Sequence, residues 1–128
     1  MPVFLLDDSK DTLKFPPPHL ASDIGLLAVG GDLSQERLLQ AYREGIFPWF
    51  SDDEPIMWWS PDPRLVLYPN EIRISKSLQR IMGKDRFRIT LDTNFEAVID
   101  ACAKTPRKHD AGTWITPDMI EAYCRLHR

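Results

Sequence analysis

Cysteine is scarce in this sequence. Its two cysteines, Cys102 and Cys124, are far apart and form no Cys-x-x-Cys pair. A disulfide framework or a cysteine-based zinc site is therefore not expected, and two reduced thiols are typical of a cytoplasmic protein. The spacing of the histidines and carboxylates predicts no metal site either.

Long apolar runs and export signals are absent as well. The apolar run 24–29 is interrupted by Gly25 and is far shorter than the roughly 20 residues that cross a membrane. The N-terminal stretch MPVFLLDDSKD has no basic region followed by an apolar core, so nothing in it indicates secretion. The sequence thus favours a cytoplasmic protein that contacts no membrane.

Recognisable catalytic constellations are also missing. Gly30 and Gly31 belong to neither GxxxxGK[ST] nor GxGxxG, which argues against a nucleotide-binding loop. The carboxylates of residues 52–54 form a charge run that we expect to be solvated. The histidines have no triad partner at a diagnostic spacing; they are His19, His109 and His127. Neither a nucleophile nor a catalytic carboxylate pair can be assigned from the residues alone.

Composition and charge describe a globular protein with an uneven charge distribution. Of 128 residues, 43% are hydrophobic and 27% are charged, and the net charge is −3. Residues 1–62 hold 4 Lys and Arg against 11 Asp and Glu, whereas residues 63–128 hold 12 against 8. A basic half can serve a polyanion contact, although charge alone favours chance surface composition.

Helices and strands are both predicted from periodicity and end signals. Val3 to Leu6, 64–68 and 87–92 are strand-like, and Gly30-Gly31 indicates a turn. Helices are expected from Ser34 to Gly45, from Ser75 to Met82, from a Thr93/Glu96 capping box through Cys102, and from Thr116-Pro117 to the last residue. Residues 104–113 are expected to form a polar loop. The pattern indicates an α/β or α+β fold with a boundary near Asp62.

The segment GIFPWFSDDEPIMWWSPDPR (45–64) concentrates rigid aromatic surface, with three of the four tryptophans. A lone tryptophan is by default a core residue. The surrounding prolines and Gly45 instead favour turns that hold Trp49 at a surface cleft. Trp114 in GTWIT also lies between a glycine and a predicted helix, so both rings are candidates for the walls of a slot for a leucine- or phenylalanine-sized group.

A basic row follows the aromatic segment. Lys76, Arg80 and Lys84 are spaced i, i+4, i+8, on the helix side opposite Leu78 and Ile81. Such spacing suits successive phosphates of a nucleic acid. A merely solvated face is the alternative, and the sequence alone favours it.

Six strings together resemble the bacterial leucyl/phenylalanyl-tRNA–protein transferase family. They occur in the family's order and are GGDLS (30–34), AYREGIFPWF (41–50), WWSPDPR (58–64), SKSLQR (75–80), GTWIT (112–116) and AYCRLH (122–127). The resemblance implies an enzyme that moves leucine, phenylalanine or also methionine from aminoacyl-tRNA to a protein beginning with Arg or Lys. The modified protein would pass to the ClpS adaptor and the ClpAP protease for degradation under the N-end rule. Neither a cofactor nor DNA is implied.

The same resemblance implies residue roles. Trp49 and Trp114 match positions that line the donor pocket, and Lys76, Arg80 and Lys84 match the basic cluster for the tRNA acceptor stem. Trp58 and Trp59 are expected mainly to pack. Two positions depart from the family pattern: Arg73 replaces a common histidine, and Gly83 replaces a residue that is basic in some members. These departures leave the tRNA affinity open.

The implied fold is α+β, with a small N-terminal α/β domain (1–62) and the start of a GNAT-like domain (63–128). The family's residues for peptide-bond formation match positions beyond Arg128, so the catalytic residues are not expected in this sequence. We therefore expect a truncated chain that is inactive alone and oligomeric through uncovered strands. If the 128 residues are a whole protein, a non-catalytic module that binds an RNA end or an apolar ligand is the alternative.

Overall fold

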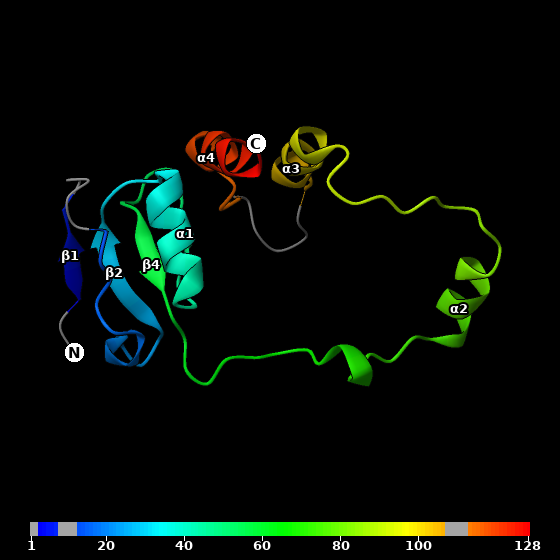
Figure 1. Cartoon of the computed structure of the whole chain (residues 1–128), viewed down its shortest axis with the longest axis horizontal. Helices are drawn as coiled ribbons and strands as arrows, with labels where there is room; N and C mark the ends of the chain where they lie inside the picture. Colours follow the sequence, from blue (N-terminus) through cyan, green and yellow to red (C-terminus); the bar gives the residue numbers. More distant parts are fainter. Residues whose placement is uncertain (1–2, 8–12, 107–112) are drawn as a thin grey trace. The chain divides into compact units, whose positions relative to one another are not determined.

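A four-stranded sheet organises the N-terminal part of the chain. The computed structural model describes residues 3–7, 13–106 and 113–128. The strands are β1 (Phe4–Leu6), β2 (Leu26–Gly30), β3 (Phe47–Pro48) and β4 (Met57–Trp59), in the spatial order β1-β2-β4-β3. Figure 1 shows β1, β2 and β4 side by side. β1 runs parallel to β2, and the other pairs are antiparallel. Only β1 was predicted as a strand from the sequence.

The turn after β2 depends on glycine. Gly30 and Gly31 have φ values of +93° and +72°, which side-chain-bearing residues rarely adopt. A Cβ on Gly30 would lie 2.8 Å from the Leu6 carbonyl oxygen, and one on Gly31 would lie 3.1 Å from Cζ of Arg37. The predicted Gly-Gly turn is confirmed, and it lets the chain pass close to β1 before helix α1 begins.

Helix α1 (Gln35–Arg43) covers the core with one face. The Ser34 hydroxyl accepts a hydrogen bond from the Arg37 amide, and Gly45 has φ +73° after the last turn, as the end signals predicted. Leu38 and Ala41 are fully buried. The buried face is narrow, because Leu39 and Tyr42 beside these residues are about half exposed.

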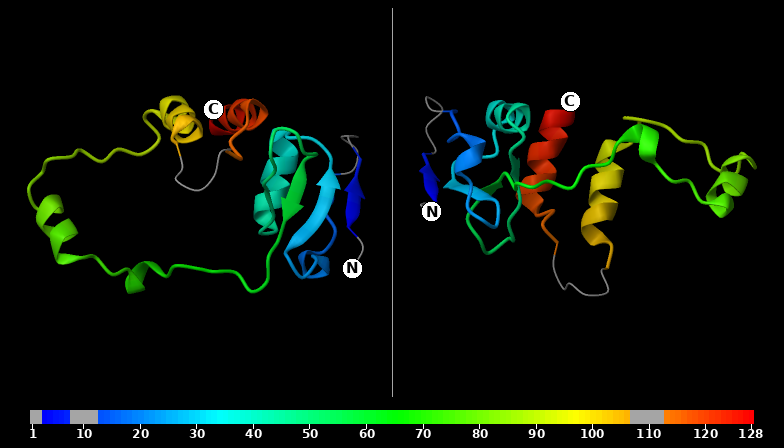
Figure 2. Two further views of the ribbon diagram at one scale, coloured as in Figure 1. Left: turned by 180° about the vertical axis from the view of Figure 1, so that it is seen from behind. Right: turned by 90° about the horizontal axis from the view of Figure 1, so that it is seen from below.

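Helices α3 (Phe95–Lys104) and α4 (Pro117–His127) pack on each other, and α4 also contacts α1 (Figures 1 and 2). The Thr116 hydroxyl caps α4, as predicted. The predicted Thr93/Glu96 capping box is wrong. Thr93 donates to the Thr90 hydroxyl, and the Glu96 carboxylate pairs with Arg128 at 2.8 Å, which ties the ends of the two helices together. Within the described residues, no helix is both long and apolar enough to span a membrane.

Trp58 lies at the centre of the hydrophobic core. Its side chain is fully buried, and its indole N–H donates to the Gly30 carbonyl at 2.9 Å. The Phe15 ring meets it edge to face, with the centroids 4.8 Å apart. The other buried apolar residues around it come from β2, α1, the segment before β3 and α4: Leu27, Ala28, Leu38, Ala41, Ile46 and Ala122.

The chain divides into two compact units. One consists of residues 1–62 and 95–128, and the other of residues 63–94. The second unit holds α2 (Lys76–Met82) and a short 3-10 turn (Pro69–Glu71). The assignment of sequence domains to 1–62 and 63–128 stays a prediction.

The strands predicted at 64–68 and 87–92 are wrong. Neither segment pairs with another strand among the described residues, and Leu65, Phe87 and Leu91 are 77–99% exposed. An apolar, β-branched pattern indicates a strand only where a partner supplies the ladder. The mixture of helices and sheet agrees with the α+β class, whereas the GNAT-like architecture stays a prediction. The expected polar loop at 104–113 lies mostly outside the described residues.

Candidate functional site

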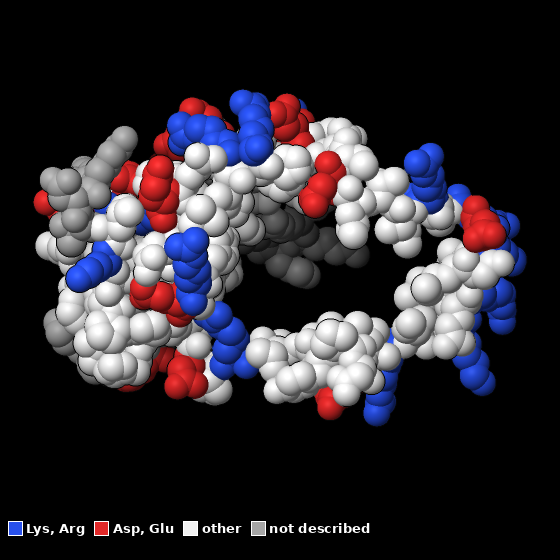
Figure 3. All heavy atoms as spheres, in the orientation of Figure 1, with Lys and Arg blue, Asp and Glu red and all other residues white. Residues whose placement is uncertain are grey.

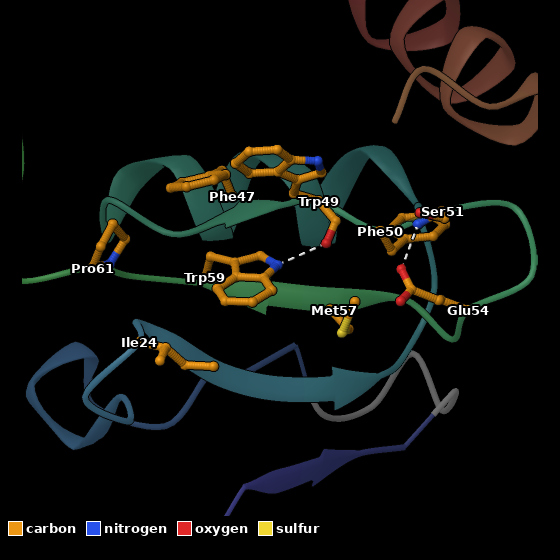
Figure 4. Close-up of a pocket in the computed structure, with 9 residues that line it drawn as sticks. All are labelled: Ile24, Phe47, Trp49, Phe50, Ser51, Glu54, Met57, Trp59 and Pro61. Atoms are coloured by element: carbon orange, nitrogen blue, oxygen red, sulfur yellow. Dashed lines mark hydrogen bonds between the residues drawn. The ribbon is translucent and has the colours of Figure 1, made fainter. Parts of the chain in front are cut away.

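Hydrogen bonds fix the Trp49 backbone through both its amide and its carbonyl group, whereas more than half of its side chain is exposed. The Trp49 amide donates to the Met57 carbonyl at 3.0 Å, and the Trp49 carbonyl accepts from the Trp59 indole N–H at 2.7 Å (Figure 4). Ile46, Pro48 and Phe50 are buried, whereas the Trp49 side chain is 56% exposed. The segment therefore anchors its even-numbered side chains and presents Trp49 outward, as alternation along an extended chain requires.

Strand β4 continues this division of faces. Trp58 points into the core, so Met57 and Trp59 point to the other side of the strand. On that side an open groove of about 490 Å³ lies along β3 and β4 (Figure 4). We call it the aromatic groove; its walls are Ile24, Phe47, Trp49, Phe50, Met57, Trp59 and Pro61, with Ser51 and Glu54.

A second cavity joins the two tryptophans singled out in the sequence. It measures about 160 Å³ and is lined by Phe47, Pro48, Trp49 and Trp114, and we call it the tryptophan cavity. Trp49 and Trp114 are 65 positions apart in the sequence, and the fold brings them to one apolar space. What that space binds stays a prediction.

The size of the tryptophan cavity suits a small apolar group. An apolar cavity of about 150 Å³ is large enough for benzene. A phenylalanine ring or a leucine side chain is of that class. Trp114 also lines a third, purely apolar cavity of about 240 Å³ between α3 and α4, together with Phe95, Ile99 and Met119.

Polar groups are few at these cavities. Among the described residues, Glu54 is the single ionisable side chain that lines the aromatic groove or the tryptophan cavity. Its Oε2 accepts from the Ser51 amide at 2.8 Å, and its own amide donates to the Ser51 carbonyl at 3.0 Å. Residues 52–54 are exposed, as expected for a solvated charge run. The sequence did not indicate that Glu54 borders the aromatic groove. Phe47 and Trp59 were likewise missed as wall residues, although the alternation in IFPWF (46–50) was a usable signal for Phe47.

The basic row (Lys76, Arg80 and Lys84) lies in the 63–94 unit, whereas both tryptophans lie in the other unit. The Ser75 hydroxyl caps α2 by accepting from the Leu78 amide at 3.2 Å, as predicted. The helix ends at Met82, so two cations of the row are helical and Lys84 follows the Gly83 cap. All three side chains are exposed, and Figure 3 shows Lys and Arg gathered over the segment that carries α2. Their role stays a prediction.

Asp32 and Tyr123 have shifted pKa values, and neither lines the aromatic groove or the tryptophan cavity. Burial raises the pKa of Asp32, but hydrogen bonds from Ser34 and the positive charge of Arg37 outweigh it, so the pKa lies below the ordinary 3.8. Burial and the hydrogen bond with Tyr42 raise the pKa of Tyr123. No group of three His, Cys, Asp or Glu side chains in the described part of the chain could hold a metal ion. The cavities thus provide binding surfaces rather than an assembled acid–base pair.

Comparisons with known proteins converge on one family. Residues 31–62 match the family model "Leucyl/phenylalanyl-tRNA protein transferase N-terminal domain", and residues 66–128 match "Leucyl/phenylalanyl-tRNA protein transferase". The leucyl/phenylalanyl-tRNA–protein transferase of Solidesulfovibrio magneticus is 60% identical over 127 residues, which cover 99% of this chain and 50% of that protein. The relatives of the same name from Syntrophobacter fumaroxidans and Pseudomonas putida are 58% and 57% identical, covering 100% and 94% of this chain and 53% and 54% of theirs. The chain spans about half the length of the curated relatives it matches.

Proposed function

Since the chain belongs to the leucyl/phenylalanyl-tRNA–protein transferase family, we propose that the whole protein transfers leucine or phenylalanine from aminoacyl-tRNA to the N-terminal Arg or Lys of a protein. The membership confirms the resemblance that the six sequence strings indicated. The activity and its substrates remain the proposal, because the matched relatives extend over about twice the compared length.

The observation that carries the proposal is the tryptophan cavity. Trp49 directly follows strand β3 and Trp114 precedes helix α4, yet both line one apolar space of about 160 Å³. A donor side chain placed there would be recognised by shape and apolar contact, which accommodates leucine and phenylalanine and rejects charged side chains. The hydrogen bonds on both sides of Trp49 keep its wall in place before the donor arrives.

The chemistry is attack of the acceptor's α-amino group on the ester carbonyl of the aminoacyl-tRNA. A C–N bond forms, the bond to the tRNA ribose oxygen breaks, and a base accepts the proton from the amine. Because the ester is already activated, positioning and stabilisation of the oxyanion suffice, and we propose that neither a metal nor a free cofactor takes part. We place the proton-transferring groups in the part of the relatives that this chain does not match, within a GNAT-like domain.

The remaining assignments follow from family membership. We propose that the basic row contacts phosphates of the tRNA acceptor stem, because its three cations are exposed and free to track a nucleic-acid backbone. The product would pass to the ClpS/ClpAP system in the cytoplasm. A binding module without transfer activity is the competing function, since the described cavities hold no acid–base pair.

A chimera tests the proposal. The chain would be joined to the unmatched part of the relative that is 60% identical to it. Incubation with labelled Phe-tRNA and a peptide beginning with Arg should yield a peptide extended by one phenylalanine, at a rate close to that of the relative itself. A chimera that is folded and binds Phe-tRNA but transfers nothing, beside an active relative, would favour the binding module.

A further inference from the structure

Trp114 is a wall of two different cavities. It lines the tryptophan cavity of about 160 Å³ together with Phe47, Pro48 and Trp49. It also lines the cavity of about 240 Å³ between helices α3 and α4, which we call the α3–α4 cavity. Of the described residues that line these spaces, Trp114 alone is common to both. A displacement of its ring therefore enlarges one space at the expense of the other.

The α3–α4 cavity is suited to receive an aromatic ring. Its walls include Phe95 and Ile99 from α3 and Met119 and Tyr123 from α4. Neither a carboxylate nor a cation is among the described residues that line it, and the Tyr123 hydroxyl is already bonded to Tyr42. Apolar contact favours an indole that enters such a space, and the flexible Met119 side chain can adapt to its shape.

Hydrogen bonding leaves the Trp114 ring more freedom than two other tryptophan rings have. The indole N–H groups of Trp58 and Trp59 each donate to a backbone carbonyl, at 2.9 and 2.7 Å. No described residue accepts a hydrogen bond from the Trp114 indole. The backbone beside it is fixed, since the Ile115 amide donates to the Thr113 hydroxyl at 3.1 Å. Rotation of the Trp114 side chain between rotamers therefore breaks no hydrogen bond within the described chain.

We propose that the α3–α4 cavity is a reserve space for the Trp114 ring, and that Ile99 sets the largest group that the tryptophan cavity accepts. This inference rests on the proposed function, and it concerns the specificity of the same site. A cavity of about 150 Å³ holds benzene, so a rigid tryptophan cavity has little room for anything larger than a phenyl ring. A wall that yields lets one site take side chains of unequal size. Ile99 lines only the reserve space, so it is a positioning residue that acts through Trp114.

Changing Ile99 in opposite directions tests the inference. Ile99→Phe adds a ring to the reserve space, whereas Ile99→Ala enlarges that space. The matched control is Ala101→Phe, which adds the same ring to α3 at an exposed position that lines neither cavity. The probes are leucyl-, phenylalanyl- and tryptophanyl-adenosine in which an amide replaces the reactive ester. Calorimetry measures their binding to the complete chain.

The expected result depends on ligand size. Ile99→Phe should weaken the tryptophanyl probe by about tenfold, the scale of an overpacked apolar site, and the leucyl probe by less than about twofold. Ile99→Ala should tighten the tryptophanyl probe, and Ala101→Phe should change none of the probes. Equal losses for all probes, or the same loss in Ala101→Phe, would overturn the inference. If Ile99→Phe does not fold, unchanged or weaker tryptophanyl binding in Ile99→Ala overturns it.

Methyl NMR of the methionines reports on the wall itself. Met119 is 1% exposed and lines the α3–α4 cavity, whereas Met82 lies on α2 in the other unit. The tryptophanyl probe should shift the Met119 methyl resonance more than the leucyl probe does, and it should leave Met82 unchanged. A bound tryptophanyl probe with an unshifted Met119 resonance overturns the inference alone. Failure of every probe to bind the wild-type chain overturns the proposed function as well.

Discussion

Replacing Trp49 by alanine should weaken donor binding by about 20-fold. A tryptophan exposes up to about 250 Å², so a side chain that is 56% exposed offers roughly 140 Å² to ligands. A donor in the tryptophan cavity covers one of the two ring faces, or roughly 70 Å². At about 25 cal/mol per Å² this contact contributes about 1.8 kcal/mol, which corresponds to about 20-fold in the dissociation constant.

The assay is calorimetric titration with a phenylalanyl-adenosine in which an amide replaces the reactive ester. The buried remainder of the ring, roughly 110 Å², limits the loss in the free energy of unfolding to about 2.8 kcal/mol. Circular dichroism and denaturation must therefore establish that the variant is folded. Trp49→Phe keeps an aromatic wall and should lose far less affinity. Leu5→Ala removes a side chain that is 85% exposed on β1 and lines neither cavity, so it should lose none.

An unchanged dissociation constant in folded Trp49→Ala would refute the argument. It would mean that the cavity joining Trp49 and Trp114 is not the donor site. Loss of binding in Leu5→Ala as well would indicate a general effect on folding rather than a missing wall.

Three further predictions concern the basic row, the core and the response to acid. Changing all three cations of the basic row to glutamine should lower the salt slope of tRNA binding by about 0.7–0.9 per lost phosphate contact, with phenylalanyl-adenosine binding unchanged; a wild-type slope would mean that the row is only a solvated face. Trp58→Ala should lower the free energy of unfolding by about 3–5 kcal/mol in denaturant titration, and a loss below about 1 kcal/mol would contradict its place in the core. The pKa of Asp32 is lower in the folded chain than its ordinary 3.8, so its contribution to stability is present above that value and is lost as the pH falls through the folded-state pKa. Asp32→Asn should remove this part of the acid dependence, and identical pH–stability curves would count against a lowering of the pKa by the hydrogen bonds from Ser34 and the ion pair with Arg37.

Local signals allowed the helices to be predicted from the sequence. Ser34, Ser75 and Thr116 each cap a helix, because a hydroxyl needs only an amide three residues away to do so. Gly45 likewise ends α1 through its own backbone angle. These interactions are completed within a few positions, so the sequence window contains all their partners.

Strands could not be predicted in the same way. β3 is two residues long and includes Pro48, and it pairs with β4 through Phe47 opposite Trp59 and Pro48 opposite Trp58, which lie 12 and 10 positions further along the chain. The runs at 64–68 and 87–92 have suitable side chains but no pairing strand among the described residues. Side-chain type suggests a strand, whereas the ladder that makes one depends on a distant segment.

The sequence singled out two residues of the candidate site, Trp49 and Trp114, but it did not indicate that Glu54 borders the aromatic groove. Trp49 and Trp114 stood out in the sequence because each lies close to glycine or proline. The turn expected around Trp49 is wrong, since its backbone is extended and bonds to Met57. Glu54 was hidden in an acidic run, because its position at a groove depends on the turn closed by Ser51 and on the β3–β4 pairing. Charge is visible in a sequence, but the surface next to that charge is not.

Trp58 and Trp59 are consecutive, yet one ring fills the core and the other lines the aromatic groove. A slip of one residue in the pairing of β2 with β4 would exchange their faces. Because both side chains are indoles, the slipped arrangement would still place a tryptophan on each face. Side-chain size therefore does not disfavour the slipped register. Two directional contacts favour the observed register: Trp58 donates to the Gly30 carbonyl, and Trp59 donates to the Trp49 carbonyl. These two N–H groups thus distinguish the observed register from the slipped one.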